Sequence, residues 1–304
     1  MSNERAEDAP SGRVAVIGGG IMGNGIAQLA AMAGDAAVLH DIDEAALHRA
    51  RIAIQTSLAR FVKRGTLKAW DAGDALGRIT FATELPAAVD GAAVVIEAVS
   101  ESLELKREVW TEIATHAPPS ALLGTNTSQL SITSIASVLG DNAHRLVGIH
   151  FFNPPVMMRL VELIAGTLTA DAEVERARAF AVALGKEVVV CRKDSPGFIT
   201  SRAYAILRLE CIRMLEEGIA TAEDIDTALK LGFNFPMGPL ELGDMNGLDT
   251  YLQAISSLAT AHGERFRPTV GLRNMVAANQ LGRKSGAGFY TYNEDGTRAA
   301  QPPS

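Results

Sequence analysis

The 304-residue sequence contains little cysteine, no excess of positive charge and no long apolar run, and each scarcity excludes a class of protein. Its two cysteines, Cys191 and Cys211, sit in apolar surroundings without the spacing of metal ligands. We therefore expect buried free thiols in a reducing compartment and no metal site. No apolar run reaches the roughly 18 to 20 residues that span a bilayer, so no membrane association is expected.

Negative charge outweighs positive charge along the chain. The 28 Lys and Arg residues face 35 Asp and Glu residues, which gives a formal net charge of -7. A nucleic-acid partner normally needs a clustered basic surface, so we expect none. The first residues, MSNERAEDAPSG, resemble neither a signal peptide nor an Arg-rich transit peptide. We therefore expect a cytoplasmic protein with a flexible N-terminal tail over residues 1–12.

A glycine motif between a strand signal and a helix signal is the strongest feature that is present. Residues 13–23 read RVAVIGGGIMG, and an apolar helical stretch follows. This Gly-x-Gly-x-x-Gly spacing is typical of a turn that binds pyrophosphate. Gly18 permits the tight turn, Gly20 lets the backbone approach phosphate, and Gly23 lets the helix pack against the strand. We expect a dinucleotide to contact the loop residues Gly18, Gly20, Ile21, Met22 and Gly23.

A carboxylate at the end of the next strand signal favours this interpretation over a plain strand-to-helix turn. Asp41 ends the run AAVLHD, at the distance where a carboxylate accepts hydrogen bonds from the adenosine ribose. It favours NAD over NADP, because a 2'-phosphate would face a negative charge with no adjacent arginine. Arg49 and Arg51 lie too far along the next helix to supply that arginine.

Strand and helix signals divide the chain into two domains. Apolar strand signals alternate with amphipathic helices, which is typical of a doubly wound, largely parallel sheet, and the strands are expected at 36–41, 92–99, 121–126, 145–153 and 186–191. From about Pro196 only helical patterns punctuated by Gly and Pro follow. We expect an α/β fold with a Rossmann-like domain over residues 13–192, a helical arm near 45–70, and a second, all-helical domain over 193–304.

Several collinear motifs together resemble the L-3-hydroxyacyl-CoA dehydrogenase family, including its bacterial 3-hydroxybutyryl-CoA enzymes. They run from VIGGGIMGNGIAQ through IEAVSE, TNTSQLSI, GIHFFNPP, LVELI, DSPGF and FPMGPLELGD to GRKSGAGFY, and they cover nearly the whole chain. The resemblance implies an NAD-dependent enzyme of fatty acid metabolism that interconverts a 3-hydroxyacyl-CoA and the 3-oxoacyl-CoA. It also implies a homodimer formed through the helical domain.

A histidine at a predicted strand end is the natural acid/base. His150 follows the apolar run VGI and precedes FFNPP, at the carboxyl end of a strand, where open α/β sheets place ligands. A satisfied core histidine is the alternative, but Glu162 interrupts the apolar run LVELI, and a buried carboxylate needs a partner. Such a pair would fix the imidazole tautomer, and the family uses that pair in catalysis. An ion pair of Glu162 with Arg159 remains open.

Other polar residues take their roles from the resemblance. Ser128 would hydrogen-bond the substrate 3-oxygen, although it could equally cap the following helix. Asn126 and Asn153 would hold the nicotinamide region or a neighbouring water. Glu101 and Lys106 would contact the cofactor, whereas the residues by themselves suggest an ordinary solvated helix face.

The thioester end of the substrate also has candidate residues. Ser57, Lys63 and Arg64 lie on one arm-like helix, where basic residues suit the phosphates of coenzyme A, with an exposed basic face as the alternative.

Ser201 stands where the family commonly carries an asparagine that faces the active site. The serine hydroxyl can donate one hydrogen bond, whereas the asparagine amide can donate two and reaches further. This difference weakens the assignment of a short-chain 3-hydroxybutyryl-CoA substrate. Asp244 is expected to cap a helix or to make an interdomain contact.

These features predict a cytoplasmic NAD-dependent 3-hydroxyacyl-CoA dehydrogenase with His150 as acid/base and Glu162 as its orienter. Two alternatives remain: the same chemistry on a free hydroxy acid or an acyl carrier protein thioester, and a catalytically silent dinucleotide-binding protein. A usable basic phosphate clamp would favour CoA. A silent binder would need the glycines and Asp41, but it would not need Ser128, His150 and Glu162 together.

Overall fold

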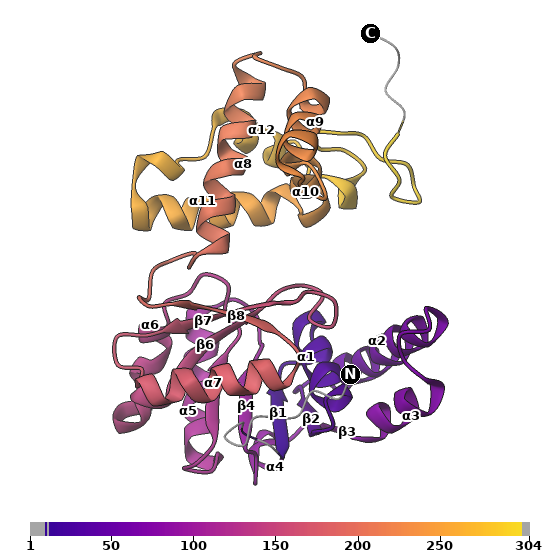
Figure 1. Ribbon diagram of the computed structural model, residues 1–304. Coiled ribbons are helices and arrows are strands. Elements are labelled where there is room, and N and C mark those ends of the chain that lie inside the picture. The colour runs from indigo at the N-terminus through magenta and orange to yellow at the C-terminus, as the bar shows by residue number, and fades with distance from the viewer. Residues whose placement is uncertain (1–9, 11, 300–304) are drawn as a thin grey trace. The chain divides into compact units, whose positions relative to one another are not determined.

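The computed structural model describes residue 10 and residues 12–299, which form two compact units. The first unit extends to Ser195 and the second begins at Pro196. The flexible tail predicted over residues 1–12 lies outside the described residues, apart from Pro10 and Gly12. The two units are described separately below (Figure 1).

Within its described residues the first unit is built on one eight-stranded sheet with the strand order β3-β2-β1-β4-β5-β6-β7-β8. The strands are β1 (Arg13–Ile17), β2 (Ala36–His40), β3 (Ile79–Ala82), β4 (Val94–Glu97), β5 (Leu122–Thr125), β6 (Leu146–Phe151), β7 (Leu160–Ala165) and β8 (Glu187–Cys191). Neighbouring strands are parallel except for β6 and β7, which are antiparallel. The predicted doubly wound, largely parallel sheet is confirmed.

Helices cover this sheet and form the arm. They are α1 (Ile21–Met32), α2 (Glu44–Lys63), α3 (Ala69–Gly77), α4 (Leu85–Val89), α5 (Leu103–His116), α6 (Ile132–Ala136), the 3-10 segment η1 (Ser137–Arg145) and α7 (Asp171–Ala183). Figure 1 shows α2 and α3 to one side of the strands. Asp43 caps α2 by accepting from Ala45 N at 2.9 Å, and the buried side chains of α2 recur every three or four residues, as on one helix face.

Strand β3 is absent from the sequence-based expectation. It is only four residues long and lies at the sheet edge, where of its side chains only Ile79 is fully buried. A short, half-exposed edge strand carries little of the apolar signal that marks the central strands.

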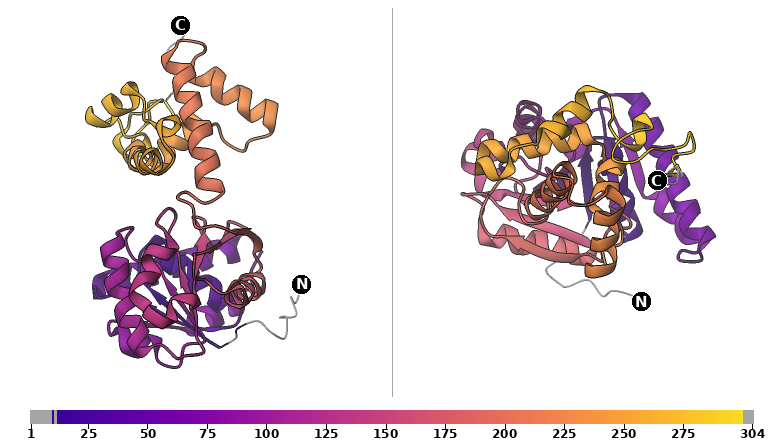
Figure 2. Two further views of the ribbon diagram at one scale, coloured as in Figure 1. Left: turned by 90° about the vertical axis from the view of Figure 1, so that its left-hand side faces the viewer. Right: turned by 90° about the horizontal axis from the view of Figure 1, so that it is seen from above.

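The second unit is helical, as expected. Its helices are α8 (Thr200–Glu216), α9 (Ala222–Phe233), α10 (Pro239–Asn246), α11 (Leu248–His262) and α12 (Val270–Ala277), with the 3-10 turns η2 (Glu264–Phe266) and η3 (Arg283–Ser285) (Figure 2). They pack around a core that includes Leu209, Leu240, Leu248, Ile255 and Leu272. Up to residue 299 the last segment adds isolated β-bridges, such as that of Tyr292 with Arg298.

Asp244 is not a helix cap, because it lies within α10. It is fully buried inside the second unit, where its carboxylate accepts from Phe289 N at 3.0 Å, Tyr290 N at 2.9 Å and Tyr292 Oη at 3.1 Å. Gly288 is required beside it, because a Cβ there would overlap the carboxylate. Asp244 therefore joins the C-terminal segment to α10, and burial raises the pKa of its carboxyl group.

The two cysteines differ in burial. Both are free thiols, as predicted, and Cys211 is buried, so that desolvation raises the pKa of its thiol to about 11. Cys191 is half-buried rather than buried, and its thiol donates to Lys193 O at 3.2 Å.

No helix within residues 12–299 combines the length and the apolar character that crossing a membrane requires.

Candidate active site

His150 and Glu162 lie opposite each other in the antiparallel pair of β6 and β7. His150 Nδ1 is 2.9 Å from Glu162 Oε2, and the two residues are 7% and 0% exposed. Facing residues in an antiparallel pair bring their Cβ atoms to about 5 Å, so this register itself forms the contact. Arg159 pairs with Glu187 instead, at 2.8 Å, which removes the alternative partner considered for Glu162.

This contact determines what the imidazole can do. A carboxylate accepts only, so Nδ1 carries the proton, and the lone pair of the neutral ring is on Nε2. The buried carboxylate also stabilises the imidazolium, which forms when Nε2 takes up a proton and the ring then carries one proton on each nitrogen. The ring of Phe152 lies against His150, with centroids 4.5 Å apart, and further restricts the ring orientation. His150 therefore has the geometry of an oriented acid/base.

Asn126 follows β5 and joins the carboxyl ends of the two strands that flank it, β4 and β6. Its Oδ1 accepts from Phe151 N at 2.8 Å, while its own N–H donates to Glu97 O at 2.8 Å. Because the oxygen is engaged, the carboxamide NH2 is the group that could reach a ligand. Asn153, two residues after β6, lines a separate pocket described below.

Ser128 lies in a turn that is held by Glu101. Glu101 Oε1 accepts from Thr127 Oγ1 at 2.6 Å, Ser128 N at 2.9 Å and Ser128 Oγ at 3.2 Å. Ser131, not Ser128, caps α6 by accepting from Ser134 N at 3.0 Å, so the capping alternative for Ser128 is wrong. The structure therefore brings the predicted substrate residue Ser128 and the predicted cofactor residue Glu101 into one hydrogen-bonded turn.

Lys106 is fully buried, which contradicts the solvated-face alternative for this residue. Its Nζ donates to Glu97 Oε1 at 2.6 Å and lies 3.5 Å from Glu101 Oε2. Glu97 is also fully buried and accepts from Trp110 Nε1 and Thr125 Oγ1. Sequence reasoning missed Glu97, although a carboxylate at the end of the apolar run AAVVIE is the kind of signal that identified Glu162.

The glycine loop has the geometry that a dinucleotide needs. Gly18 has a φ of 113°, and a Cβ there would lie 2.7 Å from Ala98 O. Gly20 faces open space, and a Cβ on Gly23 would collide with Gly18 O. In the described contacts no side chain caps α1, and its first turn holds no acidic residue. Its N–H groups can therefore bind an anion.

Asp41 occupies the position expected of the ribose-binding carboxylate. Its Oδ2 accepts from Gly19 N at 2.7 Å, and its Oδ1 accepts from Asp43 N at 2.9 Å. Together with Gly18, Gly20, Ile21 and Met22 it lines a pocket of about 690 Å³. Among the described residues that line this pocket none is lysine or arginine, as expected for NAD rather than NADP.

The two arginines that follow Asp41 have other partners. Arg49 pairs with Asp43 at 3.2 Å, and the guanidinium of Arg51 lies 4.4 Å from the ring centroid of Phe81. The residues present therefore fit a bound NAD.

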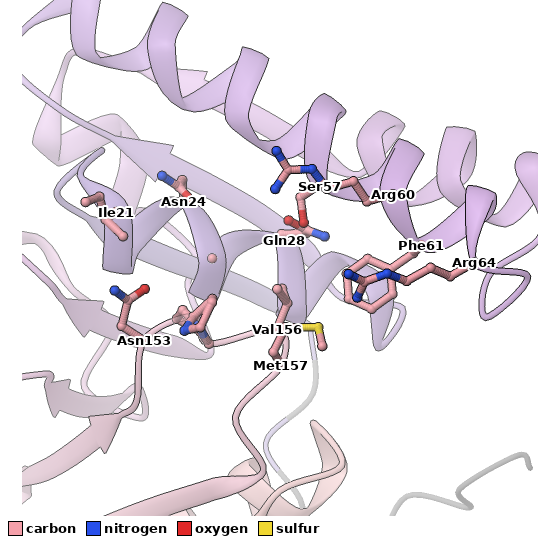
Figure 3. A pocket seen from close by; sticks show the side chains of 13 residues that line it. Ile21, Asn24, Gln28, Ser57, Arg60, Phe61, Arg64, Asn153, Val156 and Met157 are labelled. Atoms are coloured by element: carbon pink, nitrogen blue, oxygen red, sulfur yellow. The ribbon is translucent and has the colours of Figure 1, made fainter. Parts of the chain in front are cut away.

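A second pocket, of about 320 Å³, lies between α1, α2 and the segment that follows β6 (Figure 3). Of the three residues predicted to bind coenzyme A, Ser57 and Arg64 line this pocket and Lys63 does not. Arg60 and Phe61 line it too and were missed. The spacing of 57, 60, 61 and 64 places these residues on one face of α2, so helical periodicity could have identified them.

Ser201 belongs to the second unit, in the first turn of α8. It is half-buried within that unit. Its role at the site therefore stays a prediction.

Comparisons with known proteins agree with this geometry. Residues 13–195 match the model of the 3-hydroxyacyl-CoA dehydrogenase NAD-binding domain, and residues 197–292 match that of the C-terminal domain. A 3-hydroxybutyryl-CoA dehydrogenase of Bradyrhizobium diazoefficiens is 41% identical over 291 residues, which cover 95% of this chain and 97% of that protein. The mouse mitochondrial hydroxyacyl-coenzyme A dehydrogenase is 40% identical, over 92% of this chain and 90% of its own. The crystal structure of (S)-3-hydroxybutyryl-CoA dehydrogenase from Ralstonia eutropha superimposes with a TM-score of 0.89 at 40% identity, and covers 93% of this chain and 99% of its own.

Proposed function

The chain belongs to the 3-hydroxyacyl-CoA dehydrogenase family, and from this premise we propose that it interconverts an L-3-hydroxyacyl-CoA and the corresponding 3-oxoacyl-CoA, with His150 as the acid/base. It is an NAD-dependent dehydrogenase. The observation that carries the assignment is the buried His150–Glu162 pair. It lies at the carboxyl ends of the parallel strands, as the glycine loop does.

The proposed chemistry follows from this pair. In the oxidation direction, His150 Nε2 takes the proton of the substrate 3-hydroxyl, and the Glu162 carboxylate stabilises the resulting imidazolium. In the reduction direction the same imidazolium returns the proton to the 3-oxygen. Bound NAD supplies the hydride acceptor and NADH the donor, at substrate C3. Ser128 would provide a second hydrogen bond to the 3-oxygen, and Ser201 would contact the acyl portion of the substrate.

We assign the other predicted residues by where they lie. The loop residues Gly18, Gly20, Ile21, Met22 and Gly23, with Asp41, would hold the adenosine and pyrophosphate part of NAD. Glu101, Lys106 and Asn126 would organise the nicotinamide end. Asn153 lines the second pocket, so it would lie beside the coenzyme A carrier rather than in the pocket of the glycine loop. Ser57 and Arg64 would hold coenzyme A, with Arg60 as an additional cation, and Lys63 is left without a direct contact.

The two alternatives are less well supported. A silent dinucleotide binder has no use for a fully buried carboxylate aimed at a histidine, because burying that charge costs stability and cofactor binding alone does not require it. A free hydroxy acid offers a single carboxylate, whereas the second pocket provides two arginines, Arg60 and Arg64, which suit the several phosphates of coenzyme A.

A homodimer in the cytoplasm, acting in fatty acid metabolism, completes the proposal. Exposed apolar side chains on the helical unit, such as Leu231 at 82% and Phe233 at 72%, support self-association. The two free thiols support a reducing compartment.

The proposal is tested by NADH consumption with acetoacetyl-CoA, compared with longer 3-oxoacyl-CoAs, free acetoacetate and an acyl carrier protein thioester. We expect turnover of CoA thioesters and loss of most of it in His150→Ala, with NADH binding retained. If no CoA thioester reacts while NADH still binds, the substrate assignment is wrong.

A further inference from the structure

The segment that links β6 to β7 is fastened by one buried lysine. Lys186 lies directly before β8, and its Nζ donates to Pro155 O at 2.5 Å and to Met158 O at 2.8 Å. Lys186 is 8% exposed. Lys186, beside the outermost strand β8, therefore holds both ends of the turn from Pro155 to Met158.

The partners of this ammonium are unusual for a buried charge. Within the described residues its hydrogen bonds are to the main-chain carbonyls of Pro155 and Met158, and desolvation lowers the pKa of Lys186. Burying an ammonium without a carboxylate costs stability, so a neutral side chain of similar length would fill the site at a lower cost. What only the ammonium provides is a fixed position for the two carbonyls.

The opposite side of the same turn rests on α1. A Cβ added to Gly25 would lie 2.7 Å from Pro155 Cδ, so the proline packs directly on the helix backbone. Lys186 and Gly25 therefore hold the turn from two sides, one by hydrogen bonds and the other by close packing.

This turn forms one wall of the second pocket. Pro155, Val156 and Met157 line the pocket together with Gly25. In Figure 3 Val156 and Met157 lie on one side, and Ser57, Arg60 and Arg64 of α2 lie on the other. The position of the turn thus determines the distance between this wall and the arm helix.

We infer that Lys186 and Gly25 are positioning residues for coenzyme A: they hold the Pro155–Met158 turn at the spacing from α2 that the carrier requires. The inference rests on the proposed function, because it takes the pocket to be the CoA pocket. His150 is held independently by the backbone pairing of β6 with β5 and β7, so loosening the turn should alter substrate binding and leave the chemical step intact.

Two variants disturb the turn by unrelated means. Lys186→Met removes the ammonium at similar length, and Gly25→Ala pushes Pro155 outward. For each we expect the KM for acetoacetyl-CoA to rise about tenfold, which corresponds to roughly 1.4 kcal/mol, with kcat and the Kd for NADH within about twofold of wild type. A KM unchanged in both variants, or a loss confined to kcat, would overturn the inference.

Matched controls separate positioning from general damage. Lys68→Met changes an exposed lysine that does not line the pocket, and Gly73→Ala adds a methyl where nothing lies within 4 Å. Both should keep the wild-type KM. If one of the two test variants fails to fold, the other still tests the inference, because they act on opposite sides of the turn.

A direct measurement separates this inference from the proposed function. Amide hydrogen exchange at Met157 and Met158, whose N–H groups donate to Pro154 O, reports the turn without any substrate. Faster exchange in Lys186→Met is expected, and unchanged exchange would contradict the inference even if the enzyme is fully active. Absence of wild-type turnover with every CoA thioester would instead refute the proposed function, whatever the exchange shows.

Discussion

His150 and Glu162 face each other across the one antiparallel strand pair within the described sheet, with Nδ1 and Oε2 2.9 Å apart. If β7 ran parallel to β6, its first residues would lie beside the first residues of β6, far from His150. Because β7 runs antiparallel to β6, Glu162 near the start of β7 lies opposite His150 near the end of β6.

Replacing the carboxylate tests this relationship. Glu162→Gln preserves shape but removes the charge that selects the tautomer and stabilises the imidazolium. We expect kcat to fall about 100-fold or more, with NADH affinity unchanged. Steady-state kinetics and NADH fluorescence titration measure both, and a kcat within threefold of wild type would refute the orienting role.

Asp41→Ala should weaken the preference for NAD. The carboxylate is the ribose partner expected in the larger pocket, and its loss removes a charged hydrogen bond worth about 1.5–3 kcal/mol. We expect the ratio of kcat/KM for NAD to that for NADP to fall at least about tenfold. An unchanged ratio would mean that Asp41 does not contact the ribose.

The basic residues of α2 should differ in their effects. Arg64→Met and Arg60→Met remove cations that line the second pocket, and each should raise the KM for acetoacetyl-CoA about tenfold, more than Lys63→Met does. A truncated acetoacetyl thioester of N-acetylcysteamine, which lacks the phosphates, is the control substrate. Its KM should be the same in all four proteins, and equal losses on both substrates would exclude a phosphate contact.

Ser201→Asn restores the residue that the family commonly has. If Ser201 determines chain length, this variant should gain severalfold in kcat/KM on short 3-oxoacyl-CoAs relative to long ones, because the amide adds a second donor group. Rates on 3-oxoacyl-CoAs from acetoacetyl-CoA to long-chain substrates, with Ser201→Ala for comparison, measure this effect. The same profile in all three proteins would remove Ser201 as a specificity determinant.

His40 should make stability fall in mild acid. Burial lowers the pKa of His40 below its usual 6.5, against the opposing effects of Thr83 O and of the carboxylates of Asp41, Glu112 and Glu84. The folded protein then keeps the ring neutral while the unfolded chain takes up a proton. The contribution of His40 is therefore complete above pH 6.5 and is lost as the pH falls below it.

Thermal unfolding at pH 7.5 and pH 5.5 tests this expectation. His40→Gln should show a smaller drop in Tm between the two pH values than wild type. The exposed His48→Gln should behave as wild type, and an equal drop in all three proteins would show that His40 does not set the acid response.

The amino-acid sequence alone determined the glycine loop, the position of Asp41 after the next strand, the largely parallel sheet and the helical second unit, because each depends on local spacing or on apolar periodicity. It also pointed to His150 and Glu162 as a pair, since a carboxylate within an apolar run requires a partner. Only the tertiary structure decided which partner. The antiparallel register of β6 and β7 selects His150, while Arg159 pairs with Glu187 on β8.

The remaining differences have the same origin. Lys106 resembles a solvated helix residue in sequence, and folding buries it against Glu97. Asp244 resembles a cap, and it accepts instead from a segment about 45 residues further along the chain. Lys186 carries no local signal, because its partners, Pro155 and Met158, lie about 30 residues earlier. Periodicity and motif spacing report what neighbouring residues do, whereas the partners of buried polar groups come from strands and turns that meet only when the chain folds.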